Sequence, residues 1–169
     1  MVEMSVQRVG IDQNRRTLVI LADEEGRRLL PIWIGPYEAQ SIAMALRKEK
    51  FERPLTHDLL LAIVDRLEYK LQRVDVTRLE DHTFYGVLGL ARGDEFVQID
   101  SRPSDAIALA LRAGAKIFVA EEVLEQAQIL EEDGEQEKVE IDKFRDLLEQ
   151  AHLDPEDPGQ DSSKGSPDE

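Results

Sequence analysis

The sequence predicts an α+β fold that is internally duplicated: two βββα units packed into one compact domain with a mostly antiparallel sheet. Runs rich in β-branched residues alternate with runs of helical spacing, and the order strand, strand, strand, helix occurs twice. Two blocks of the sequence also match each other at a common offset of 65 residues. A chain of 169 residues is long enough for one domain with a core and short for two.

The first unit begins with three strands. They are expected at residues 2–11, 17–22 and 29–34, with the turn sequences DQNRR and ADEEGRR between them. Pro31 indicates that the third strand lies at a sheet edge or contains a bulge. Trp33 points to the opposite face of this strand from Ile32 and Ile34, and no basic cluster surrounds it in the sequence. We therefore expect it in the core or at a subunit interface rather than as a stacking platform for bases.

Two helices follow these strands. Residues 35–49 have helical spacing, with Pro36 in the first turn and an apolar stripe made by Ala39, Ile42, Ala43 and Leu46. Thr56 can cap the next helix, in which Asp58 falls in the first turn. The buried face of that helix is expected to consist of Leu59, Leu60, Ile63, Val64 and Leu67.

The second unit repeats the order of the first. Strands are expected at residues 71–79, 83–91 and 95–100, followed by a helix to about Ala113, where Gly114 is a natural stop. A short buried strand at 116–120 and a helix at 121–130 complete the domain.

The repeat is clearest where a strand passes into a helix. IWIGPYEAQSIAMAL (32–46) lies over VQIDSRPSDAIALAL (97–111), and VQRVGI (6–11) lies over LQRVDV (71–76). Each unit is too small to bury its sheet alone, so the two are expected to pack together. The alanines in both helices allow a close approach of the backbones.

The net charge of −15 belongs to the C-terminal part of the chain. Residues 1–120 contain 17 Lys and Arg and 18 Asp and Glu, whereas residues 121–169 contain 4 and 18. We expect a nearly neutral domain at 1–130, a charged spacer with a short helix at 131–153, and a disordered acidic tail at 154–169. A neutral body neither supports nor forbids a phosphate-containing ligand.

Several classes of site are excluded by composition. The chain contains no cysteine, which rules out disulfides, thiolate metal sites and cysteine nucleophiles. It contains no glycine-rich phosphate loop, serine nucleophile elbow or paired zinc-type histidines. No run reaches the roughly 18 apolar residues of a membrane helix, and residues 1–10 (MVEMSVQRVG) lack the order of charged, apolar and small residues that is typical of a secretion signal, so we expect a cytoplasmic protein without a membrane partner.

Polar residues gather at the two matched corners, IGPYEAQ and IDSRPSDA. Helix capping explains Ser101, Ser104 and Asp105, but it requires neither Arg102 nor Asp100. An exposed arginine beside a helix start suits a phosphate. Alternatively, Asp100 and Asp105, with Glu38 from the first corner, supply the hard oxygen ligands that Mg²⁺ or Mn²⁺ prefers. The sequence leaves both alternatives open.

A second polar cluster is ERPLTHD at residues 52–58. In the structural interpretation Thr56 and Asp58 cap the helix and His57 is a solvated first-turn residue. In the functional interpretation His57 is a general base or a metal ligand. His82 lies in the sequence EDHT and is expected to be a plain turn residue.

Four motifs in order, LPIWIGPYEAQSIAMAL, RPLTHDLL, TFYGVLGL and IDSRPSDAIALALRAGAKIFVAEEVLE, closely resemble the bifunctional nuclease family over roughly residues 2–130. The resemblance implies metal-assisted cleavage of both DNA and RNA by a compact α+β fold that forms homo-oligomers. The positions that match the family's motifs are Arg53, Pro54, Thr56, His57, Asp58, Asp100, Ser101, Arg102, Ser104 and Asp105.

The leading hypothesis is therefore a nuclease in which Asp100, Asp105 and Glu38 hold a divalent ion (Mg or Mn) that activates a water. Arg102 clamps the phosphate, and His57 or Asp58 moves a proton. The expected substrate contacts are Arg53, Thr56, Ser101 and Ser104. The main alternative is a non-enzymatic oligomeric binding or regulatory protein, in which both corners are caps and the acidic C-terminus contacts a basic partner. A weaker alternative is a small anionic ligand bound at the helix starts.

Overall fold

The computed structural model describes residues 1–133, with side chains to residue 127, as seven strands and four helices. The strands are β1 (Val2–Ile11), β2 (Thr17–Asp23), β3 (Leu29–Trp33), β4 (Lys70–Glu80), β5 (Thr83–Arg92), β6 (Glu95–Ser101) and β7 (Lys116–Val119). The helices are α1 (Pro36–Leu46), α2 (Thr56–Arg66), α3 (Pro103–Ala113) and α4 (Glu121–Asp133). The predicted tail at 154–169 lies outside the described residues, as does the predicted spacer beyond Asp133.

All seven strands form one sheet in the order β3-β2-β1-β7-β4-β5-β6. Every neighbouring pair is antiparallel except β4 and β7, which are parallel. The α+β class with a mostly antiparallel sheet is therefore confirmed. β1–β3 lie on one side of β7 and β4–β6 on the other, so β7 joins the two strand triplets; the internal duplication itself stays a prediction. Pro31 lies in the edge strand β3, as the sequence predicted.

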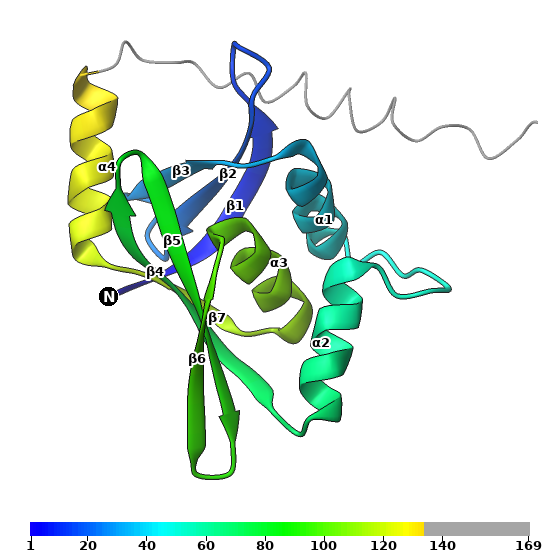
Figure 1. Cartoon of the computed structure of the whole chain (residues 1–169). Coiled ribbons are helices and arrows are strands. Elements are labelled where there is room, and N and C mark those ends of the chain that lie inside the picture. Colours follow the sequence, from blue (N-terminus) through cyan, green and yellow to red (C-terminus); the bar gives the residue numbers. More distant parts are fainter. Residues whose placement is uncertain (134–169) are drawn as a thin grey trace, which may run out of the picture.

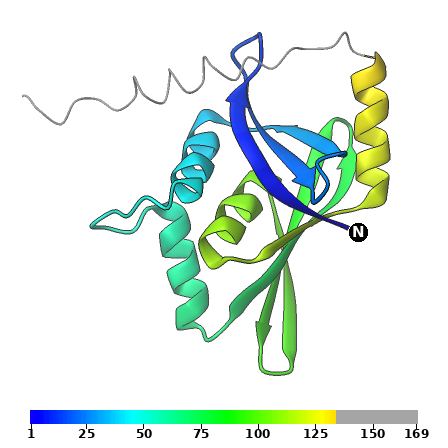
Figure 2. The same cartoon turned by 180° about the vertical axis from the view of Figure 1, so that it is seen from behind.

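The core lies between the sheet and helices α1 and α3, which pack against each other (Figure 1). Ala39 and Ala43 of α1 and three alanines of α3 are buried, and these small side chains let the helices approach closely. Ile42 and Ile107 are completely buried between them. Burying one such side chain stabilises the fold by about 1.5–3 kcal/mol. Helix α4 packs on β4 at the opposite side of the molecule from α2 (Figures 1 and 2).

The predicted buried face of α2 is wrong. Leu59, Leu60, Ile63 and Leu67 have between 43% and 58% of their surface exposed. Helix α2 packs along the outer side of α3, and its inward side carries the buried His57 and the half-buried Leu61 and Val64. Of the five residues predicted to be buried, four share a face that is turned to solvent, and only Val64 lies on the inward side.

Two of the predicted caps are also wrong. Leu55, and not Thr56, precedes the first turn of α2, and the Asp58 carboxylate accepts a hydrogen bond from the Leu55 amide at 2.9 Å. At α3 the preceding residue is Arg102, and no side chain of the described residues caps the helix. Ser101 ends β6 instead, where its hydroxyl is buried without a hydrogen-bond partner in the described part of the chain. Gly114 ends α3 with a φ of 69°, as predicted.

Gly86 fixes how closely α3 approaches the sheet. A Cβ atom on Gly86 would lie 3.1 Å from the Pro103 backbone and from the Ser101 carbonyl oxygen. Only a residue without a side chain allows β5 to pass so near the start of α3. The position of the second corner is thus set by this contact.

No helix within residues 1–133 has both the length and the apolar character to span a membrane.

Candidate functional site

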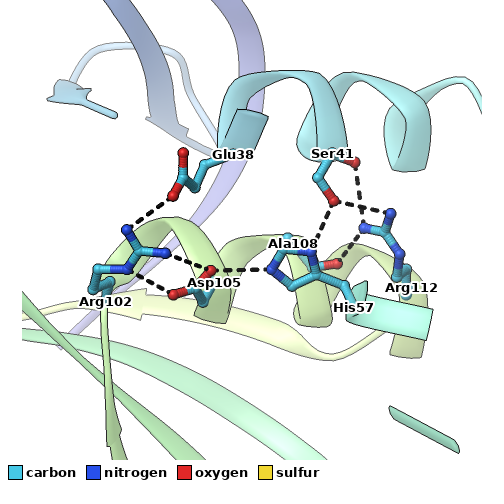
Figure 3. Close-up of polar contacts among 7 residues, drawn as sticks. All are labelled: Glu38, Ser41, His57, Arg102, Asp105, Ala108 and Arg112. Carbon is cyan, nitrogen blue, oxygen red and sulfur yellow. Dashed lines mark hydrogen bonds and ion pairs between the residues drawn. The ribbon is translucent and has the colours of Figure 1, made fainter. Parts of the chain in front are cut away.

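Arg102 joins the two matched corners. Its Nη1 lies 2.8 Å from Glu38 Oε1 at the start of α1, and its Nε and Nη2 donate to Asp105 Oδ2 and Oδ1 at 2.9 and 3.3 Å (Figure 3). The hydrogen bond and charge of Asp105, together with Glu38, raise the pKa of the Arg102 guanidinium. The Arg102 side chain is still 66% exposed, so this bridge between the corners is open to ligands.

His57 is buried between the helices, with 7% of its surface exposed. Its Nε2 lies 3.1 Å from Asp105 Oδ1, and its Nδ1 lies 2.9 Å from the Ser41 hydroxyl of α1. Because the carboxylate of Asp105 can only accept, Nε2 carries a proton in either charge state of the ring; when the ring is neutral, Nδ1 accepts from the Ser41 hydroxyl. The expectation of a solvated His57 is therefore wrong.

Arg112 completes this network from the end of α3. It donates to Asp58 Oδ1 at 2.7 Å, to the Ser41 hydroxyl at 3.1 Å and to the Ala108 carbonyl at 2.9 Å. Burial raises the pKa of Asp58, but the hydrogen bonds from Arg112 and the Leu55 amide and the charges of Arg112 and His57 outweigh it and lower that pKa. One continuous chain of polar contacts thus crosses α1, α2 and α3. It runs from Glu38 through Arg102, Asp105, His57, Ser41 and Arg112 (Figure 3) and ends at Asp58.

The remaining predicted site residues do not join this network. Asp100 pairs with Val87 in the sheet, one position before Ser101, which pairs with Gly86 beneath α3. Since neighbouring strand residues point to opposite faces, Asp100 is directed away from the corner that holds Asp105. Arg53 is exposed just before α2, and Thr56 is exposed in its first turn. Their role as substrate contacts stays a prediction.

The carboxylates do not form a cage for a metal ion. Glu38 and Asp105 both bind Arg102, and Asp100 is on the other face. Among the described residues there is no group of three or more His, Asp or Glu side chains that could hold a metal. The arrangement therefore does not fit Mg²⁺ or Mn²⁺ held by the protein alone.

A groove of about 590 Å³ opens beside Arg102. The starts of α1 and α3 contribute Gly35, Pro36, Pro103 and Ser104 to its lining, and the β1–β2 and β4–β5 turns contribute Arg15, Arg16 and His82. Trp33 also lines it and is 44% exposed, so the expectation of a core position is wrong, whereas the alternative of a subunit interface stays a prediction. The fold brings Arg15, Arg16 and Arg102 to the same groove, although no basic cluster surrounds Trp33 in the sequence. A second cavity of about 410 Å³ lies between α1, α2 and α3 and includes Asp58 and Arg112. His57 lines neither.

The family model of the bifunctional nuclease domain matches residues 19–132. This chain belongs to that family. The uncharacterized protein Rv1829 of Mycobacterium tuberculosis strain H37Rv is 35% identical over 160 residues, which cover 90% of this chain and 96% of the relative. Bifunctional nuclease 1 of Oryza sativa subsp. indica and bifunctional nuclease 1 of Arabidopsis thaliana are each 30% identical over 105 residues, covering 60% of this chain and 32% of the plant proteins.

In this bifunctional nuclease domain, the sequence alone did not point to Ser41 and Arg112 of the network or to Arg15 of the groove, and it assigned Trp33 and His82 no functional role. Ser41 and Arg112 lie inside helices, where a polar residue gives no local signal. In the sequence, Arg15 and Arg16 lie in the DQNRR turn, and the whole of β2 separates them from Trp33 in β3. Pairing of β2 with β3 was the information needed to place them together.

Proposed function

We propose that this chain is a nuclease that hydrolyses phosphodiester bonds of DNA and RNA. Arg102 carries the proposal: it is an exposed cation held between the two corners by Glu38 and Asp105, and it lines the groove. Membership of the bifunctional nuclease domain family supports the proposal, as do the nuclease names of the plant relatives.

Arg102 is assigned the binding of the phosphate. A guanidinium has five N–H donors in a fixed plane, and three of them point at Glu38 and Asp105. The other two suit the paired oxygens of a phosphodiester. Glu38 acts as a positioning residue, because it holds Arg102 from the opposite corner.

Asp105 is assigned the proton transfer. Its carboxylate takes a proton from a water whose oxygen forms the new bond to phosphorus, while the bond to the leaving oxygen breaks and solvent protonates that oxygen. His57 Nε2 donates to Asp105 Oδ1 and so orients the carboxylate. His57 and Asp58 are then positioning residues, since His57 is buried and Asp58 is bound to Arg112.

The expected requirement for Mg²⁺ or Mn²⁺ stays a prediction, and no three His, Asp or Glu side chains among the described residues come together to hold such an ion. The requirement is tested by assaying cleavage with EDTA, Mg²⁺ or Mn²⁺.

The test of the function compares four purified proteins on single-stranded DNA and RNA: wild type, Arg102→Ala, Asp105→Asn and Arg92→Ala. Arg92 is a matched control, since it is a half-exposed arginine paired with Glu95 in the β5–β6 hairpin, at the opposite end of the molecule from the β1–β2 turn (Figures 1 and 2). Losing a group that stabilises transition-state charge lowers kcat by about 100- to 1000-fold. Equal activity of all four proteins would assign the cleavage to a contaminant and reject the site.

We also propose that the chain forms a homo-oligomer through the α2 face made by Leu59, Leu60, Ile63 and Leu67. A patch of exposed apolar side chains on one helix is typical of an interface. Two copies related by a two-fold axis would cover it with the same residues. This patch is the observation that favours the alternative function, an oligomeric binding or regulatory protein, and absence of cleavage in the assay above would select it.

A further inference from the structure

We propose that the groove between the two corners binds a single strand of nucleic acid, with a base stacked on Trp33 and backbone phosphates bound by Arg15 and Arg102. The inference rests on the proposed function, because Arg102 belongs to both. Binding and cleavage are nevertheless measured separately, so one can fail without the other.

The charge of the groove indicates an anionic ligand. Three arginines line it, and none of its lining residues in the described part of the chain is Asp or Glu. This contrasts with the net charge of −15 of the whole protein. The carboxylates behind the groove, Asp12, Glu38 and Asp105, are each bound to an arginine. The groove thus presents guanidinium groups and no carboxylate on its surface, and the charge of Arg15 has no carboxylate partner among the described residues; such a surface favours the phosphates of a nucleic-acid backbone.

Trp33 provides a fixed aromatic surface in the groove. Its Nε1–H donates to Asp12 Oδ2 at 2.9 Å, which sets the orientation of the indole, and the Arg16 guanidinium lies 5.3 Å from the ring centre. The residue nevertheless remains 44% exposed. An oriented, exposed indole flanked by cations is the arrangement on which unpaired bases stack.

Arg15 extends the cationic surface away from Arg102. The β1–β2 turn holds it at a φ of 61°, in the left-handed region that non-glycine residues seldom adopt. Buried Asp12 fixes that turn, because its Oδ1 accepts from the amides of Asn14 and Arg16 at 2.9 and 2.8 Å. The Arg15 guanidinium makes no hydrogen bond or ion pair with any other residue among 1–133. It is therefore positioned by its backbone and available to a phosphate.

Ser104 adds a polar group at the floor of the groove. It lies in the first turn of α3, is 5% exposed and lines the groove. Its hydroxyl makes no hydrogen bond to another described residue. Next to the positive end of the helix, this hydroxyl suits a phosphate oxygen.

The size of the groove and the exposed indole both favour a single strand. A volume of about 590 Å³ lies within the range of ordinary small-ligand sites, which suits one or two nucleotide units. In a duplex the bases stack on each other, which leaves none free to stack on Trp33.

The test uses the fluorescence of Trp33, which is the only tryptophan of the chain. The full-length protein is titrated in EDTA with a 12-nucleotide oligothymidylate, its duplex with oligoadenylate, and thymidine monophosphate, and gels verify that the strand stays intact. We expect quenching by the single strand at concentrations at which the duplex and the mononucleotide give little. Equal quenching by all three would overturn the proposal of a strand-binding groove.

Substitutions measured by anisotropy of a labelled strand complete the test. Trp33→Leu is expected to weaken binding about 5- to 100-fold and Trp33→Phe less, because phenylalanine still stacks. Arg15→Ala is expected to weaken binding and to reduce the slope of log affinity against log salt by about 0.7, whereas Arg92→Ala changes neither. Unchanged affinity of Trp33→Leu, with its fold verified by circular dichroism, would overturn the groove. Binding that depends on Trp33 without any cleavage would reject the proposed function alone.

Discussion

The Asp12 carboxylate is completely buried and accepts four hydrogen bonds, from the Asn14 and Arg16 amides, the Arg16 side chain and the Trp33 indole. Burial raises its pKa, but these hydrogen bonds and the charge of Arg16 outweigh burial and hold the pKa below its ordinary value. Ionised Asp12 therefore stabilises the folded protein at neutral pH. This contribution is lost as the pH falls through the ordinary carboxyl pKa towards the lowered one.

We predict that Asp12→Asn lowers the free energy of unfolding by about 1–3 kcal/mol at pH 7. The difference from wild type should shrink as the pH falls from 7 to 3, and urea denaturation at several pH values measures it. Asp94→Asn, in the exposed β5–β6 turn, is the control and should change stability little at any pH. A difference that grows on acidification would contradict the assigned role of Asp12.

His57 gives a second prediction at this scale. His57→Asn breaks the contacts with Ser41 and Asp105 inside the helix layer and should cost about 1–3 kcal/mol of stability. His82→Asn is the matched control, because His82 is exposed in a turn with a φ of 60°, which asparagine tolerates. Equal stability of the two variants in urea would show that the buried contacts of His57 contribute nothing.

The sequence predicted which polar residues lie at the two corners, but it predicted only in part which of their side chains point toward one another. Arg102, Glu38 and Asp105 were predicted to converge, and they do. Asp100 was grouped with them because it is near in sequence, yet the alternation of strand β6 directs it to the other face. The partners of His57 were not predictable, since they come from helices 16 and 48 residues away.

At the scale of elements, the contact between β5 and α3 sets the second corner. Gly86→Ala places a Cβ against the Pro103 and Ser101 backbone, which cannot rotate away, so we predict a loss of about 1–3 kcal/mol in thermal or urea unfolding. Gly89→Ala in the same strand meets the side chains of Phe96 and Arg73, which can move, and should cost less. A larger loss for Gly89→Ala would contradict this account of the corner.

A further prediction concerns the exposed apolar face of α2 and its role as a subunit interface. Ile63→Glu places a charge in the exposed apolar patch, so an assembly built on that patch should dissociate to a smaller species in size-exclusion chromatography with light scattering. Leu29→Glu is the control, because Leu29 is an apolar residue of similar exposure, 42% against 48% for Ile63, on the edge strand β3. An unchanged mass of the Ile63 variant would exclude α2 as the interface.

Elements were predicted more accurately than their environment. The strands, the helix order and the Gly114 stop follow from local patterns of β-branched residues, helical spacing and turn residues, which act over a few positions. The orientation of α2 and the capping of α2 and α3 depend on which neighbour each helix meets. Local sequence carries no information about that neighbour.

At the scale of the whole molecule, the sequence predicted two strand triplets and a short buried strand but not how that strand joins them. β7 pairs with β1 on one side and β4 on the other, which makes it the centre of the sheet. The groove depends on the joining of the two strand triplets by β7, because its walls come from turns in both triplets. The cationic groove was equally invisible in the sequence, since its charges are separated by more than 80 residues.

The central place of β7 has a consequence for biosynthesis. Val2 pairs with Val119, so the ribosome must extend the chain through nearly the whole domain before the sheet can be completed. A nascent chain that stops at Ala115 exposes an unpaired edge on β1 and another on β4, both prone to association with other chains. Pairing so distant along the polypeptide also favours slow folding.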